Sequence, residues 1–188
     1  MDNVFFAIQP DEDAKSRIAA LGARLQREHG MRGKLTPPDC LHVSVHGLEP
    51  YDDAIIAAAK GVGAAIDAPC FKVGFDRVLS VNGALAIPLV LGFSDDLPAL
   101  LALRKSLDTE LQRRTGQRTR LSFTPPLTFL YSDHRVRDLH IDLIDWTVRE
   151  LVLVRSIHGQ AAIFNSDAGP CALHLDAMPG SVYYYLAI

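Results

Sequence analysis

Apolar and polar residues alternate in two short stretches of the chain that look like copies of one another. The first runs from Leu41 to Val45 (LHVSV) and the second from Pro126 to Leu130 (PLTFL). In both stretches large apolar residues flank a short polar side chain, which predicts strands in which residues two apart share a face. We therefore expect His42, Ser44 and, further along, His46 to lie on one face.

Helical periodicity appears in three longer segments. Apolar residues recur at helical spacing from about Asp11 to Gly30, Asp52 to Ile66 and Asp95 to Gly116. The first two segments open on acidic residues, which favour a helix N-terminus, and glycine is a common helix stop. The third should present leucines on one side: Leu97, Leu100, Leu101, Leu107 and Leu111.

Shorter alternating or β-branched runs predict the remaining strands. They are Val4 to Ile8, Phe71 to Asp76, Ala84 to Leu91, Ile144 to Ser156, and two strands near residues 172–175 and 182–186. Asn82-Gly83 is a hairpin-turn signal, and Pro88 suggests an edge strand or a bulge. Residues 33–39 and 159–170 are expected to be loops. The order of elements predicts an α+β protein, and because no linker interrupts it we expect one domain over residues 1–188.

Composition and charge narrow the class of protein. The chain has 188 residues, 48% of them hydrophobic, which is enough for a buried core, and a net charge of −3. That charge argues against binding to long duplex nucleic acid, which needs clustered Lys and Arg. The three cysteines lack paired spacing, so we expect reduced thiols, no metal site and a cytoplasmic location. No apolar run is long enough to span a membrane, and we expect a monomer.

The paired stretches resemble the 2H phosphoesterase superfamily, which includes bacterial 2′-5′ RNA ligases and RNA 2′,3′-cyclic phosphodiesterases. Its members carry two His-x-Ser/Thr motifs, one on a strand in each half of the chain. His42 and Ser44 match the first motif, and Thr128 matches the hydroxyl of the second. The resemblance covers most of the chain. It implies two pseudo-symmetric lobes, each an antiparallel sheet with helices outside, around a central cleft, and chemistry without a metal or other cofactor.

One residue departs from the family pattern. Where the second motif has its histidine, this chain has Pro126. In the family one imidazole acts as general base and the other protonates the leaving oxygen. Proline has neither a titratable group nor a backbone N–H, and loss of such a group typically costs about 10² to 10⁴ in rate. We expect two-histidine catalysis to be impaired, whether Pro126 is a natural loss in a binding protein or an introduced change.

Other residues are candidates for contact with substrate. Because His46 shares the predicted face of His42, it could line the cleft or replace the missing histidine, although a turn-capping role is also open. Tyr131 stands where many family members have Arg. Phe6 and Arg155 could line the cleft, with core packing and a surface ion pair as their alternatives. His134 is expected in a solvated loop.

The resemblance implies a substrate with a 2′,3′-cyclic or 2′-5′ phosphoester at the end of an RNA or in a nucleotide. His42 would be the acid/base group, and Ser44 and Thr128 would bind phosphate oxygens. Two alternatives remain open: a catalytically silent protein that binds a nucleotide or RNA end, and a small-molecule cyclic phosphodiesterase unconnected with RNA.

Overall fold

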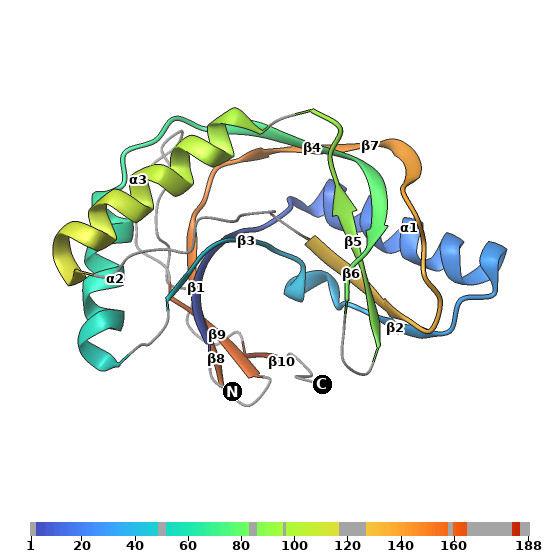
Figure 1. The fold of residues 1–188 in the computed structure, drawn as a ribbon, viewed down its shortest axis with the longest axis horizontal. Helices are drawn as coiled ribbons and strands as arrows, with labels where there is room; N and C mark the ends of the chain where they lie inside the picture. The colour runs from blue at the N-terminus through green and yellow to red at the C-terminus, as the bar shows by residue number, and fades with distance from the viewer. Residues whose placement is uncertain are drawn as a thin grey trace.

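Two antiparallel sheets of five strands each form the centre of the protein (Figure 1). The computed structural model describes residues 3–48, 52–82, 86–95, 97–116, 127–157, 160–164 and 182–184. Sheet A contains, in spatial order, β10 (Val182–Tyr184), β9 (Gln160–Phe164), β8 (Val152–Ile157), β1 (Asn3–Ile8) and β3 (Val43–Leu48). Sheet B contains β2 (Gly33–Leu35), β6 (Leu127–Ser132), β5 (Ile87–Gly92), β4 (Phe71–Ser80) and β7 (Leu139–Val148).

Three α-helices lie within the described residues and cover the outer sides of the sheets (Figure 1). They are α1 (Glu12–His29), α2 (Asp53–Ala65) and α3 (Pro98–Thr115), with a short 3₁₀ helix η1 (Pro38–Cys40) before β3. The Asp11 carboxylate accepts the Ala14 N–H at 2.9 Å, and the Asp52 carboxylate accepts the Ile55 N–H at 2.8 Å. These caps confirm the first two predicted helix starts, and Gly116 ends α3 at a φ of 72°.

Each of the two longest helices packs on a different sheet from the one that contains the strand before it. The helix α1 follows β1 of sheet A but packs on β7, β6 and β2 of sheet B. Likewise α3 follows β5 of sheet B but packs on β3 of sheet A, beside α2, with a smaller contact to β4 of sheet B. One continuous cluster of buried apolar residues therefore includes residues of both sheets and all three helices. The arrangement confirms the predicted α+β fold of two lobes with helices on the outside.

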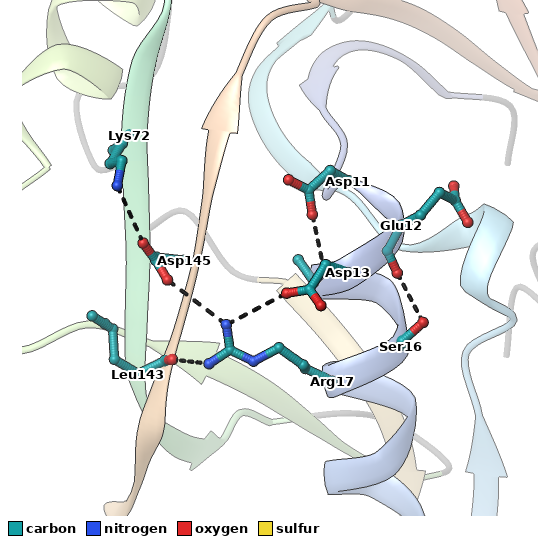
Figure 2. Close-up of polar contacts among 9 residues, drawn as sticks. Asp11, Glu12, Asp13, Ser16, Arg17, Lys72, Leu143 and Asp145 are labelled. Atoms are coloured by element: carbon teal, nitrogen blue, oxygen red, sulfur yellow. Dashed lines mark hydrogen bonds and ion pairs between the residues drawn. The ribbon is translucent and has the colours of Figure 1, made fainter.

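Polar contacts fasten α1 to the edge strand of sheet B (Figure 2). The guanidinium of Arg17 donates a hydrogen bond to the backbone carbonyl of Leu143 in β7. It also lies 3.8 Å from the carboxylate of Asp13 and 3.7 Å from that of Asp145. Asp145 in turn lies 3.8 Å from the ammonium group of Lys72 on β4, so one network joins α1, β7 and β4.

Several sequence predictions differ from the structure. Residues 33–35 form β2 although a loop was expected, and β9 occupies residues expected to lie in a second loop. The single strand expected from Ile144 to Ser156 is two strands, because the chain leaves sheet B after β7 and enters sheet A at β8. Pro88 lies in an internal strand beside a bulge, so the bulge was predicted correctly and the edge was not.

Smaller differences concern α3 and the chain's end. Leu101, which was expected on the apolar side of α3, is 46% exposed, and Leu103, which was not among the expected leucines, is buried in the core. Strand β10 falls within the predicted strand near residues 182–186, while Gly83, Pro126 and residues 172–175 lie outside the described residues. No helix among the described residues is long and apolar enough to cross a membrane.

Candidate functional site

The first motif strand contains a β-bulge immediately after its hydroxyl residue. In the antiparallel pairing of β1 with β3, Phe6 lies opposite His46 and Ala7 lies opposite Ser44, which leaves Val45 as the extra residue. A bulge of this kind shifts the alternation of side chains along the strand. Val43, Val45, His46 and Leu48 are consequently all buried, while Ser44 is half-buried and Gly47 is exposed.

The second motif strand has its bulge in the equivalent place. In the pairing of β5 with β6, Leu89 lies opposite Leu130 and Val90 opposite Thr128, which leaves Phe129 as the extra residue. The burial pattern along β6 repeats that of β3, with Thr128 and Tyr131 half-buried between buried neighbours. The bulges align Val45 with Phe129 and hence Ser44 with Thr128 and His42 with Pro126.

Cross-strand pairing assigns these residues to a face. Directly opposed residues of an antiparallel pair point to the same side. Phe5 and Ala7 form a small apolar cluster with Val152 and Val154, on the opposite side of sheet A from the main core. We call this side of sheet A, together with the side of sheet B that carries Thr128 and Val90, the motif face. Ser44 lies on it opposite Ala7, and the strands β3 and β6 contact one another.

His42 also lies on the motif face. Its ring centroid is 5.2 Å from that of Phe5, and its Nδ1 lies 2.9 Å from the carbonyl oxygen of Cys40. In the neutral ring this carbonyl accepts the Nδ1 proton, which makes Nε2 the basic nitrogen. Burial lowers the pKa of His42, and the hydrogen bond to Cys40 opposes that effect without cancelling it. The imidazole is therefore uncharged at neutral pH and suited to accept a proton.

The predicted common face of His42, Ser44 and His46 is wrong, because the bulge at Val45 turns His46 to the core face. There His46 is 7% exposed, and its Nε2 lies 3.5 Å from the carboxylate of Asp108 on α3. Burial lowers the pKa of His46, against the opposing effect of Asp108. This contact joins α3 to the first motif strand. His46 therefore lies on the opposite side of sheet A from Ser44, the predicted phosphate-binding residue.

Register also places Phe6 and Arg155 on the core face. Phe6 is fully buried opposite His46, and Arg155 of β8 lies opposite Val4, whose side chain belongs to the core. Core packing, the alternative for Phe6, is what the structure shows. Both residues therefore lie on the side of sheet A opposite to the motif face.

Tyr131 lies on the motif face of sheet B with Thr128. Its partner across the β5–β6 pair is Pro88, two residues from the Val90 that faces Thr128. Burial raises the pKa of its hydroxyl, so the phenol is a neutral hydrogen-bonding group at neutral pH. His134 is exposed, and its ring lies 2.6 Å from the carboxylate of Asp133, consistent with the surface position expected.

Sequence reasoning missed two features of this site. The Cys40 carbonyl sets the tautomer of His42, but a backbone acceptor has no signature in a side-chain pattern. Phe5 was expected only as part of the first strand, although alternation with Phe6 could have placed it on the opposite face.

Solved structures share this fold. Escherichia coli LigT in complex with 3′-AMP matches with a TM-score of 0.68 and 19% identity, over 92% of this chain and 98% of that chain. A structure described as a phosphoesterase matches at 0.65 and 18%, over 93% and 99%. The protein TT0787 of Thermus thermophilus matches at 0.62 and 16%, over 98% of each chain. No family model and no curated protein sequence matches the chain. The two-lobed α+β fold implied by the sequence resemblance is thereby confirmed.

Proposed function

We propose that this chain, with its LigT-like fold, is a 2H phosphoesterase-like protein that binds 2′,3′-cyclic or 2′-5′ phosphoester ends of RNA or nucleotides. His42 is its acid/base group, and Ser44 and Thr128 bind the phosphate oxygens. The protein needs no metal for this, acts as a monomer and works in the cytoplasm. The observation that carries the proposal is the pair of equivalent bulges. From strand pairing alone, they give Ser44 and Thr128 equivalent positions in the two sheets.

Local geometry supports a defined role for His42. Its neutral ring, oriented by the Cys40 carbonyl, can accept a proton from water at Nε2 as the water oxygen attacks phosphorus. The hydroxyls of Ser44 and Thr128 can donate to the phosphoryl oxygens, where negative charge increases in the transition state. The bond from phosphorus to one ribose oxygen then breaks, and that oxygen must gain a proton.

Pro126 leaves this last proton without a protein donor at the position equivalent to His42. We therefore propose that hydrolysis by this chain is slow while binding is retained. Pro126 is also the observation that favours a second candidate, a catalytically silent protein that holds a nucleotide or RNA end. The ligands in LigT structures, which include 3′-AMP, phosphate and ATP, support a small anionic ligand in either case.

The two candidates separate in one experiment with the Pro126→His variant. Hydrolysis of 2′,3′-cyclic AMP is measured for the parent chain, for the variant and for a Pro126→His/His42→Asn double variant as control. For an impaired enzyme, Pro126→His raises kcat by about 10² to 10⁴, and the second substitution abolishes the gain.

Binding of 3′-AMP, measured by calorimetry, completes the test. Binding by a parent and a variant that are both inactive favours the silent binder. Absence of both hydrolysis and binding contradicts the proposed function. A panel of RNA ends, mononucleotides and other cyclic phosphates, tested with the active variant, decides whether the substrate is connected with RNA.

A further inference from the structure

The strand β2 lies against the second motif strand although it precedes the first motif in sequence. Lys34 is opposite Tyr131 and Leu35 is opposite Leu130. Beyond the end of β2, the N–H of Thr36 donates to the carbonyl oxygen of Phe129 at 2.9 Å. Phe129 is the neighbour of Thr128 in sequence, so Thr36 pairs with the part of β6 that carries the proposed phosphate-binding hydroxyl.

Side-chain direction along β2 follows from its contact with α1. Gly22 of α1 lies so close to Leu35 that an added Cβ would be 2.4 Å from Leu35 Cδ2, so Leu35 points toward the helix. Alternation along an extended chain then turns Lys34 and Thr36 to the other side, which is the motif face. The register agrees for Lys34, which is opposite Tyr131, a residue of that face.

The side-chain polar groups of Lys34 and Thr36 do not hold the described residues together by hydrogen bonds or ion pairs. The Oγ1 of Thr36 is buried and has no hydrogen-bond partner among the described residues. Buried polar groups are nearly always hydrogen-bonded, so such an atom calls for a partner. Lys34 is exposed and makes no ion pair within the described part of the chain.

We propose that β2 and its end complete the second half of the site: Thr36 donates a hydrogen bond to a phosphate oxygen beside Thr128, and Lys34 neutralises the charge of that phosphate. The proposal rests on the proposed function and adds a hydroxyl and a cation to the half of the site that lacks its histidine. The ligand class is a nucleotide with a terminal phosphate. Lys34 would recognise the negative charge of that phosphate, and Thr36 would recognise one of its oxygens.

The test is titration of the chain of residues 1–188 with 3′-AMP by calorimetry. Thr36→Val removes the hydroxyl at nearly constant shape and should weaken binding about tenfold or more, as loss of a hydrogen bond to a charged group does. Thr36→Ser should restore most of the affinity. Lys34→Ala should weaken binding several-fold at low salt, with a smaller effect in 0.5 M NaCl because salt screens exposed charges (the Debye length is roughly 4 Å at that concentration).

Matched controls lie at the other end of sheet B, on the edge strand β7 and on its neighbour β4. Thr147→Val on β7 and Lys72→Ala on β4 change the same residue types and should leave 3′-AMP binding unchanged. Thr36→Val should also keep or raise the melting temperature, since it removes a buried hydroxyl that has no protein partner among the described residues; a marked fall would show that the hydroxyl serves the fold.

The outcomes separate this proposal from the proposed function. If Ser44→Ala and Thr128→Val weaken binding but Thr36→Val and Lys34→Ala do not, the site stands and the role of β2 is refuted. If the parent chain does not bind 3′-AMP at all, both are refuted.

Discussion

Replacing Gly33 with alanine should unfasten β2 from the second motif strand. Gly33 has a φ of 154°, a conformation that residues with a Cβ rarely adopt. An added Cβ would lie 1.9 Å from the carbonyl oxygen of Tyr131 and 2.9 Å from its carbonyl carbon. These are backbone atoms of β6, a strand paired on both sides with β2 and β5. They cannot yield as the end of a flexible side chain would, so β2 must move instead.

The magnitude follows from two terms. Backbone strain at such a position costs about 1–3 kcal/mol, and the displaced β2 also loses its pairing with β6. We expect a total loss of roughly 3 kcal/mol, which for a domain of this size lowers the melting temperature by about 6–12 °C. Urea unfolding and a thermal scan measure the two quantities.

Gly47→Ala is the matched control. Gly47 also lies in a strand beside a motif, but an added Cβ there meets nothing within 4 Å. Its substitution should change the free energy of unfolding by no more than about 0.5 kcal/mol. If Gly33→Ala is as stable as Gly47→Ala, the close pairing of β2 with β6 is refuted, and with it the placement of Lys34 and Thr36.

Two further predictions concern α1 and His42. Asp11→Ala removes the cap of α1 and should lower the free energy of unfolding by about 1 kcal/mol in urea titrations; an unchanged value would contradict the capping role. Because burial lowers the pKa of His42 below 6.5, the unfolded chain binds more protons than the folded one as the pH falls through that value, so stability falls with it. Unfolding free energies at about pH 7.5 and pH 5.5 should differ less for His42→Asn than for the parent, and His46, whose pKa burial also lowers, contributes to the difference that remains. An equal difference in both proteins would show that His42 titrates normally in the folded state.

Features with a local cause could be predicted from the sequence. The carboxylates of Asp11 and Asp52 cap the next turn of backbone, and Gly116 provides the left-handed residue that ends α3. These interactions join residues a few positions apart, so the residue types alone indicate them. The two motif strands were predicted for a similar reason, because alternation over a few residues is visible in the chain itself.

Features that depend on a distant partner could not be predicted in the same way. The bulge at Val45 exists only in the pairing with β1, and without it alternation assigns His46 to the wrong face. Strand β2 has only three residues and is held at the edge of sheet B by backbone hydrogen bonds. It therefore shows no alternation of apolar and polar residues that could have revealed it in the sequence. No Gly or Pro marks residues 149–151, where the chain passes from sheet B to sheet A, so β7 and β8 looked like one strand.

Because α1 packs on sheet B and α3 packs on β3 of sheet A, dividing the chain between its two halves would take helix packing away from both sheets. A fragment that ended before β5 would keep β1 and β3 but lose α3, and the carboxylate of Asp108 would be missing beside His46. The other fragment would keep β6 without α1 to cover it. The two motif halves therefore depend on one another for packing. A substitution on α3 should alter the packing of the motif strand β3 in the first half, and a substitution on α1 should alter the packing of the motif strand β6 in the second.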